Sequence, residues 1–337
     1  MIEIITEKKE WNLLVEGVDA YDFYSTYDYH ILACTHGEQP LLIKYLNEDV
    51  IIGIPLLIRE IPHSPYFDAT SVYGYSGPLT KNVNENFNNE NFKRELNEFF
   101  VKNKIVSVFS RLNPYIPYQR TVLNSIGEIK LKGDIVMIDL DQNIKEQKKQ
   151  YQKRVRTHIN KARKLCILRK AETEEDIKTF IKLYYENMER VGAKRSYFFS
   201  DDYFFKFTDN DQSQIEILLA SLIDTGEVIS GGMFLKTKDI VQYHLSGTQT
   251  EYLDVGALKL MIDEVRINAT NEGYKVFNLG GGLNSNNDSL LRFKKSFSKK
   301  SKKFSVWQYI VNETVYEELC ENLDLEGSDY FPIYRKP

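Results

Sequence analysis

The sequence predicts an α/β protein made of two similar halves. The chain has 337 residues, and a chain of this length is expected to form two domains of about 150 residues each. Apolar runs with strand spacing alternate with helical patterns in both halves. The content of 42% hydrophobic and 27% charged residues is typical of a globular protein. We therefore expect one domain over residues 1–145 and a second over residues 146–337.

The first half reads as strands joined by short helices. Pro40–Leu46 and Val50–Ile58 are apolar runs with three polar residues between them, which predicts a β-hairpin. Asn91–Lys102 has apolar residues at helical spacing. The other expected elements are strands at 2–5, 67–77, 105–110 and 135–140, and helices at 11–18, 24–34 and 116–126.

The second half repeats this plan after a basic, helical junction at residues 141–164. Three apolar runs with turn residues between them predict an antiparallel meander. Because helices precede a meander in each half, a duplicated α/β unit is indicated. The expected elements are strands at 166–169, 215–222, 228–235, 240–246, 276–279 and 304–311, and helices at 174–191, 201–207, 255–271 and 288–297.

Positive charge is concentrated in two places in a chain of net charge −4. Residues 145–164 carry nine basic residues against the single acid Glu146, and residues 292–303 carry seven basic residues and no acid. Such islands in an acidic protein suggest a local polyanion site rather than a groove for long nucleic acid, and predict no DNA partner. Two solvated helix faces are the alternative interpretation.

Other classes of protein find no support in the sequence. No apolar run has the length of a membrane span, and the first residues do not resemble a signal peptide. The three cysteines are far apart and lack the spacing of metal ligands, as do the five histidines. These features predict a reduced, cytoplasmic protein without a metal site.

A glycine-rich segment near the end of the chain is the most informative motif. The apolar strand that begins at Lys275 runs into Gly280, Gly281 and Gly282, and a basic helix follows from Asp288. Consecutive glycines let backbone amides approach a ligand closely, and the start of a helix offers further N–H groups. This arrangement suits an anionic or acyl-transfer ligand. A glycine-rich turn before a solvated helix is the alternative.

The order of elements over residues 165–311 resembles the GNAT acyltransferase fold. Four segments, which are Arg156–Arg163, Gln242–Thr248, Gly273–Gly282 and Leu291–Phe297, resemble successive motifs of the Fem-type branch. That branch includes the aminoacyltransferases that build peptidoglycan interpeptide bridges. The resemblance implies two tandem GNAT-like domains, each a mixed, mostly antiparallel sheet flanked by helices.

The resemblance extends into the first half and covers residues from about 20 to 311. Val72–Leu79 and Val108–Pro114 resemble motifs of the N-terminal domain of the same branch. The Arg/Gln-x-x-Gly-x-Gly/Ala signature of CoA-binding members is absent, and Tyr252–Ala257 stands in its place. The donor is therefore left open between acyl-CoA and aminoacyl-tRNA, and no tightly bound cofactor is expected.

The resemblance implies catalytic residues in the second half. Lys294, in the Phe-Lys pair, would stabilise charge on the reacting acyl group. Tyr243 and His244 lie on one strand and should point to opposite faces, and His244 could act as a general base. For Lys294 the alternative is an ordinary surface lysine, and for His244 a structural histidine. Because no Ser–His–Asp or Cys–His arrangement is suggested, direct attack by the acceptor is expected.

The remaining candidates would bind substrates. Arg195 resembles an arginine that holds the diphosphate of the acceptor, which suits its planar fork. The loop around Gly74 could present Tyr73 and Tyr75 to an interdomain cleft, and Arg111 belongs to the neighbouring N-domain motif. The donor is assigned to Gly280, Gly281, Gly282, Phe293 and Gly256.

The function that the resemblance implies is acyl or aminoacyl transfer to an amine. The expected acceptor is an amino sugar or peptide on a nucleotide- or lipid-linked precursor of a cell-envelope glycan, and charged tRNA would be a partner if it is the donor. The sequence does not decide whether the protein binds the membrane surface to reach a lipid-linked acceptor. A catalytically silent binding module for a nucleotide-linked glycan is the alternative, because a fold does not fix a function.

Overall fold

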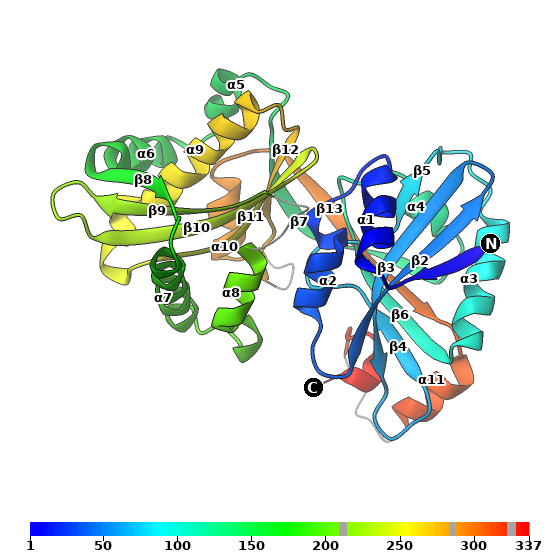
Figure 1. Ribbon diagram of the computed structural model, residues 1–337. Coiled ribbons are helices and arrows are strands. Elements are labelled where there is room, and N and C mark those ends of the chain that lie inside the picture. Colours follow the sequence, from blue (N-terminus) through cyan, green and yellow to red (C-terminus); the bar gives the residue numbers. More distant parts are fainter. Residues whose placement is uncertain (209–213, 284–286, 322–327, 337) are drawn as a thin grey trace. The chain divides into compact units, whose positions relative to one another are not determined.

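The computed structural model describes residues 1–208, 214–283, 287–321 and 328–336 (Figure 1). The chain forms two compact units, of which the first contains Met1–Lys132 and Lys303–Pro337 and the second contains Gly133–Lys302. The chain enters the second unit within β7 (Glu128–Asp139) and leaves it within β13 (Ser301–Ile310). This division differs from the boundary between residues 145 and 146 that the sequence suggested.

Strand β13 is the reason for the difference. We expected it to close the second half, and this was wrong, because β13 pairs antiparallel with β6 (Ile105–Leu112) from Ser305 opposite Leu112 to Ile310 opposite Ser107. Its Trp307 is fully buried in the hydrophobic core of the first unit. The indole N–H donates a 2.6 Å hydrogen bond to the carbonyl oxygen of Ile126. The end of the chain therefore completes the first unit.

The sheet of the first unit has the strand order β1-β2-β3-β4-β6-β13, with β5 beside β3. The neighbours are antiparallel except β4 and β6, which are parallel. The predicted hairpin is confirmed as β2 and β3. The further strands are β1 (Ile2–Ile5), β2 (Glu38–Asn47), β3 (Val50–Glu60), β4 (Phe67–Thr70) and β5 (Leu79–Lys81).

Short helices complete the first unit. α3 buries Phe92, Leu96 and Phe100 along one side, as their helical spacing predicts. The helix expected over residues 116–126 is reduced to the single turn of α4. Tyr118, immediately before this turn, has a left-handed backbone conformation, so the helix cannot begin earlier. The elements are α1 (Lys8–Gly17), η1 (Phe23–Ser25), α2 (Tyr27–Ala33), α3 (Glu90–Lys102), α4 (Gln119–Val122), α11 (Glu313–Cys320) and η5 (Ile333–Arg335).

The sheet of the second unit has the order β7-β12-β11-β10-β9-β8. β11 and β12 are parallel and the other neighbours are antiparallel, so the predicted meander is confirmed as β9, β10 and β11. The strands are β8 (Cys166–Lys170), β9 (Gln214–Leu222), β10 (Val228–Thr237), β11 (Ile240–Thr248) and β12 (Val276–Gly280).

Helices cover both faces of this sheet, with α6 and α9 on one face and α7 and α8 on the other (Figure 1). On the first face, Ile159 of α6 and Leu260 of α9 share a core with Ala220 of β9. On the second face, Gly231 of β10 has no side chain, so Phe180 of α7 packs closely there. The helices are α5 (Ile144–Lys149), α6 (Lys153–Leu165), α7 (Glu174–Arg190), η2 (Arg195–Tyr197), α8 (Asp201–Thr208), η3 (Thr250–Val255), α9 (Ala257–Asn271) and α10 (Ser289–Lys295).

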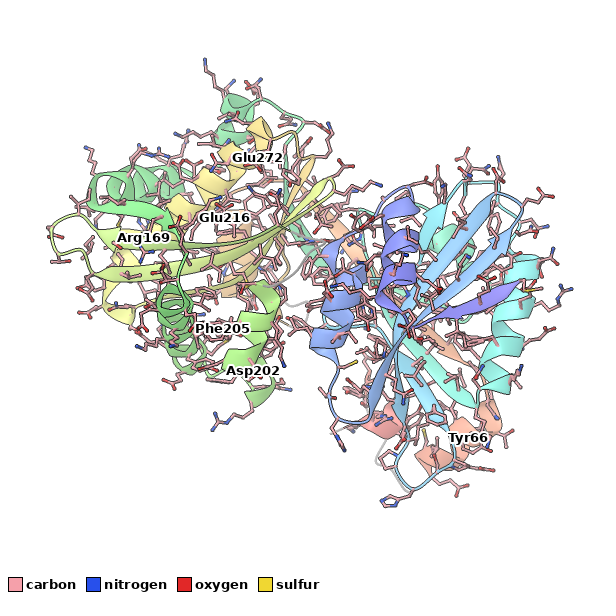
Figure 2. The ribbon with its side chains drawn as sticks, in the orientation of Figure 1. Tyr66, Arg169, Asp202, Phe205, Glu216 and Glu272 are labelled. Atoms are coloured by element: carbon pink, nitrogen blue, oxygen red, sulfur yellow. The ribbon has the colours of Figure 1, made fainter. Side chains whose placement is uncertain are left out.

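Two groups of buried charges fix the helices and strands of the second unit. The Asp263 carboxylate of α9 accepts hydrogen bonds from Arg266 and from Arg163 of α6, and both Asp263 and Arg266 are fully buried. At the other end of the sheet, Lys236 of β10 forms ion pairs with Glu216 at 3.3 Å and Glu272 at 2.8 Å, and Figure 2 labels both acids. Buried charges with these partners hold the elements in one arrangement.

Candidate active site

The middle strands β11 and β12 separate partway along their length. Their parallel pairing runs from Ile240 opposite Val276 to Gln242 opposite Asn278. On the other side of β11, Met233 of β10 pairs with Leu245 and Phe234 pairs with Tyr243. His244 therefore lies in a β-bulge, which bends a strand and reorients its side chains. Beyond Gln242, β11 does not pair with β12 among the described residues, so this part of its edge is a candidate for ligand binding.

Lys294 lies where the two strands separate. Its Nζ donates a 2.8 Å hydrogen bond to the carbonyl oxygen of Gly281 and lies 5.9 Å from the centre of the Tyr243 ring. Only 9% of the residue is exposed, so Lys294 is not a surface lysine. Burial lowers the pKa of the ammonium to about 8, and the nearby Asp288 opposes this shift. The group remains mostly protonated at neutral pH.

The first two glycines of the motif make room for this contact. Gly280 has a φ of +80°, and a Cβ there would lie 2.9 Å from Nζ of Lys294. A Cβ at Gly281 would lie 2.8 Å from the carbonyl oxygen of Asp134. Gly282 is half-buried. A side chain at either of the first two positions would collide with its neighbours, so the close approach depends on glycine. Part of the polar loop that follows lies outside the described residues.

Tyr243 and His244 point to opposite faces of the sheet, as expected. The Tyr243 ring lies near Lys294, and its hydroxyl forms a 2.5 Å hydrogen bond with Ser246. Burial raises the pKa of Tyr243 to about 12, so its phenol stays neutral. This side of β11 therefore carries the Tyr243 ring within 5.9 Å of the Lys294 ammonium.

His244 faces α8, where its Nε2 lies 3.1 Å from the Tyr203 hydroxyl and its ring stacks on Phe207. Burial lowers the pKa of His244 to about 3. The imidazole is neutral at pH 7 and too weak a base for efficient proton abstraction, which favours a structural role over general-base catalysis. Tyr203 is not among the candidates taken from the sequence, although the helical spacing of the aromatic residues in α8 indicated an aromatic surface beside His244.

A cluster of basic residues surrounds the beginning of α9. Gly256, with a φ of +82°, precedes this helix, and a Cβ there would lie 2.9 Å from Cβ of His158 on α6. Nζ of Lys259 lies 2.8 Å from Nδ1 of His158. Burial lowers the pKa of Lys259, and the positive charge of Arg154 lowers it further. Crowded positive charge at a helix N-terminus favours an anion. The first basic island supplies part of this cluster.

Two of the seven basic residues of the second island form ion pairs with acids that the structure describes. Lys295 pairs with Asp134 at 2.9 Å, and Lys300 pairs with Asp139 at 2.5 Å. Phe293 packs edge-on against Phe297, which lies in the core. These contacts give Lys295, Lys300 and Phe293 structural roles. Lys294 is the member of the island that contacts the glycine motif.

Arg195 lies on η2, apart from the glycine motif. It is exposed, and its guanidinium lies 5.5 Å from the centre of the Phe198 ring. Within the described part of the chain, neither a hydrogen bond nor an ion pair joins Arg195 to Lys294. The predicted anchor is therefore available to a ligand, but the protein's own contacts do not bring it to the lysine.

Tyr73, Tyr75 and Arg111 belong to the first unit. The Arg111 guanidinium lies 5.9 Å from the centre of the Tyr73 ring, which is exposed. Tyr75 is half-buried, and its carbonyl oxygen accepts a 3.0 Å hydrogen bond from the Asn113 side chain. The same amide group donates to the buried Asp22 carboxylate. This loop is therefore held in a defined shape that presents one exposed aromatic ring beside an arginine.

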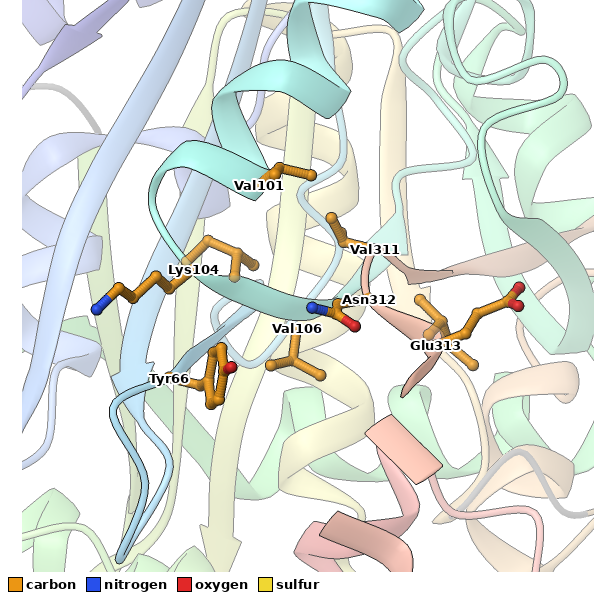
Figure 3. A pocket seen from close by; sticks show the side chains of 9 residues that line it. Tyr66, Val101, Lys104, Val106, Val311, Asn312 and Glu313 are labelled. Carbon is orange, nitrogen blue, oxygen red and sulfur yellow. The ribbon is translucent and has the colours of Figure 1, made fainter. Parts of the chain in front are cut away.

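The first unit also contains a half-open pocket of about 370 Å³ (Figure 3). The side chains of Lys104 and Glu313 extend from it in opposite directions. None of the candidate site residues lines it. The lining residues are Tyr66, Val101, Lys104, Ile105, Val106, Ile310, Val311, Asn312 and Glu313.

Comparison with known proteins agrees with this geometry. Residues 149–295 match the acetyltransferase (GNAT) domain family. This match contains the separated strands, the glycine motif and Lys294. A search of curated protein sequences found no significant match.

Three solved structures show the same fold at low identity. FemX is 16% identical with a TM-score of 0.72, and the match covers 94% of this chain and 99% of FemX. The C-terminal domain of a putative lysylphosphatidylglycerol synthetase from Agrobacterium fabrum is 11% identical with a TM-score of 0.56, covering 91% and 92%. A tandem GNAT protein from the clavulanic acid biosynthesis pathway is 9% identical with a TM-score of 0.51, covering 93% and 99%.

The fold and the domain match together define the class of this protein. Residues 149–295 form an acyltransferase domain of the GNAT type, and the protein is an acyltransferase. Over nearly its whole length the chain shares the fold of FemX, as the sequence resemblance implied. Among the described helices, none is both long and apolar enough to cross a membrane.

Proposed function

We propose that this protein transfers an acyl or aminoacyl group to the amine of an amino sugar or peptide carried on a nucleotide- or lipid-linked precursor of a cell-envelope glycan. The observation that carries the proposal is the buried ammonium of Lys294, which lies at the separated strands β11 and β12 beside Tyr243. The fold shared with FemX and with a putative lysylphosphatidylglycerol synthetase domain supports the choice of cell-envelope substrates.

In the proposed reaction, the acceptor amine attacks the carbonyl carbon of the donor directly. Negative charge then develops on the carbonyl oxygen, and the Lys294 ammonium stabilises it in a site with little water. The neutral Tyr243 hydroxyl is placed to donate a second hydrogen bond or to protonate the leaving group. The proton of the amine passes to water or to the leaving group, because the low pKa of His244 makes it a poor acceptor.

The donor would extend along the open edge of β11 towards the beginning of α9. A donor amide can pair with backbone groups of β11 beyond Gln242, where the pairing with β12 ends. The glycines of the motif and Phe293 would line its acyl end. Its phosphates would lie at Gly256, near Lys259. Acyl-CoA has amides between its acyl group and its phosphates, so it can make all of these contacts. Aminoacyl-tRNA carries its acyl group on the terminal ribose, so it would use the acyl and phosphate contacts alone.

Arg195, Tyr73 and Arg111 are the residues proposed to bind the acceptor. In the second unit, Arg195 would bind a diphosphate through two parallel hydrogen bonds, as a guanidinium does with phosphate oxygens. In the first unit, the exposed Tyr73 ring and Arg111 would hold a sugar or nucleotide, and Tyr75 would support the loop that carries them.

A donor screen tests the proposal. The purified protein is incubated with acetyl-CoA or with aminoacyl-tRNA in the presence of UDP-linked amino sugars and muropeptides, and new amides are detected by mass spectrometry. Transfer that Lys294→Ala abolishes supports the proposal. Tight binding of an acceptor with no turnover of either donor would instead establish a silent binding module. Strong salt dependence of donor binding would identify tRNA rather than CoA.

A further inference from the structure

Strand β8 lies at the border of the second unit's sheet and is paired with one strand, β9 (Figure 1). The pairing runs from Cys166 opposite Leu222 to Lys170 opposite Leu218. On the other side of β8, the backbone N–H and C=O groups of Leu168 point away from β9. The Lys170 carbonyl oxygen there accepts a 3.3 Å hydrogen bond from the Arg169 side chain, and the Cys166 N–H donates to the carbonyl oxygen of Ala162. Unpaired strand edges of this kind are the usual template for pairing with another strand.

Large apolar side chains are exposed beside this edge. Ile167 is 59% exposed, Ile223 is 55% exposed and Leu165 is 40% exposed. The backbone N–H of Ile223 donates a 2.9 Å hydrogen bond to the carbonyl oxygen of Leu165, so these residues lie at the same end of the β8–β9 pair. Ile167 lies on the same side of β8 as Arg169, whose guanidinium pairs with Asp176 in the first turn of α7. A partner at this edge would cover the three side chains.

The charges on β8 do not prevent pairing. Charged residues on short edge strands usually repel a second strand. Here Arg169, labelled in Figure 2, forms an ion pair with Asp176 at 2.6 Å. Lys170 forms an ion pair with Glu216 at 3.1 Å. Both positive charges are therefore neutralised by acids of the same unit.

The residues that flank β8 are complementary in charge to a second copy of the same strand. If two copies of β8 pair antiparallel about a two-fold axis at Leu168, Ile167 lies opposite Arg169 of the other copy, and no like charges lie opposite each other. The same symmetry brings Lys164 of each copy to the end of the strand pair where Glu172 of the other copy lies. Within the described part of the chain, Lys164 and Glu172 take part in no ion pair, and both are exposed.

We propose that two copies of this chain associate through antiparallel pairing of their β8 strands and form one sheet across the two-fold axis. The backbone groups at the edge supply the hydrogen bonds. The exposed Leu165, Ile167 and Ile223 supply the apolar contact, and the two symmetric pairs of Lys164 with Glu172 fix the register. The interface involves one short strand from each copy, so the dimer is concentration-dependent.

Sedimentation equilibrium of the full chain over a concentration series tests this association. The wild type is expected to approach twice the chain mass of 39.4 kDa as its concentration rises. Ile167→Lys places a lysine opposite Arg169 of the other copy and should weaken dimerisation at least about tenfold. Leu13→Lys changes an equally exposed apolar residue on α1, far from β8 in the chain, and should leave the dimer unchanged.

A charge swap tests the register without touching the strand. Lys164→Glu should weaken the dimer, because it places two acids together at each end. Glu172→Lys should weaken it by placing two lysines together, and the double variant should restore it. A wild type that stays monomeric up to about 100 µM, a concentration well above the Kd of most specific complexes, would overturn the proposal. An unchanged dimer in Ile167→Lys, or no rescue in the double variant, would overturn it as well.

Discussion

The ammonium of Lys294 is held by a 2.8 Å hydrogen bond to the carbonyl oxygen of Gly281, thirteen residues earlier in the chain. The bond joins α10 to the turn that ends β12, and it aims a buried positive charge at the place where β11 and β12 separate. One contact therefore connects the glycine motif to the basic helix. The rate of acyl transfer and its pH dependence should both depend on this contact.

Removing the ammonium should slow acyl transfer. Lys294→Ala is expected to lower kcat roughly 10²- to 10³-fold, as the loss of one oxyanion donor does. Lys294→Arg should recover only part of the rate, because a planar fork does not reproduce a compact charge. Lys295→Ala is the matched control, since Lys295 pairs with Asp134 and should change kcat little. Equal effects at both positions would remove Lys294 from the mechanism.

The rate should fall at alkaline pH. Burial lowers the pKa of Lys294 to about 8, so the protonated form that stabilises the oxyanion is present below this pH and is lost above it. We expect kcat to decrease with increasing pH through this value, about tenfold per pH unit beyond it. In Lys294→Arg the guanidinium stays protonated, so the remaining activity should lose this decline. A pH–rate profile of both proteins checks the assignment, and an identical decline in the variant contradicts it.

A side chain at Gly280 should disturb the lysine. Gly280→Ala places a methyl group 2.9 Å from Nζ of Lys294 and strains a backbone with a φ of +80°. Gly273→Ala is the matched control, because Gly273 has a φ of +88° and no atom lies within 4 Å of the position that its Cβ would take. Both variants should lose about 1 kcal/mol of stability from the left-handed backbone. Only Gly280→Ala should also lower kcat, and equal rates in the two variants would contradict the close contact.

Arg195 should act on binding rather than on chemistry. An anchor for the acceptor's phosphates contributes equally to the ground state and the transition state, so Arg195→Ala should raise the acceptor KM about tenfold with kcat nearly unchanged. Lys194→Ala, at the neighbouring exposed position, is the control. Initial rates at varied acceptor concentration separate the two parameters. A loss confined to kcat would argue against the anchor.

The buried charge network should control stability. Asp263→Ala leaves the fully buried Arg266 without its carboxylate, which is expected to cost about 3–5 kcal/mol of unfolding free energy. Glu264→Ala removes the other, partly exposed partner of Arg163 and should cost less than about 1 kcal/mol. Denaturant unfolding of both variants measures the difference. An equal loss of unfolding free energy in the two variants would mean that groups other than Asp263 compensate the charge of Arg266.

Local sequence determined most of the elements and the chemical class of the site. Helical spacing placed α3 and α7, and turn residues between apolar runs placed the meander, because these patterns act over a few residues. The glycine motif suited an anionic or acyl-transfer ligand, because consecutive glycines let backbone amides approach a ligand. The resemblance of several segments to the Fem-type branch of the GNAT acyltransferases then indicated an acyltransferase.

Tertiary structure decided what depends on distant partners. The sequence could not show that β13 joins β6 in the first unit, since strand pairing between remote segments leaves no local pattern. It could not distinguish a buried Lys294 from a surface lysine, because burial depends on what packs against α10. The same reason applies to His244: only the enclosure by Tyr203 and Phe207 lowers its pKa and turns a candidate base into a neutral, hydrogen-bonded ring.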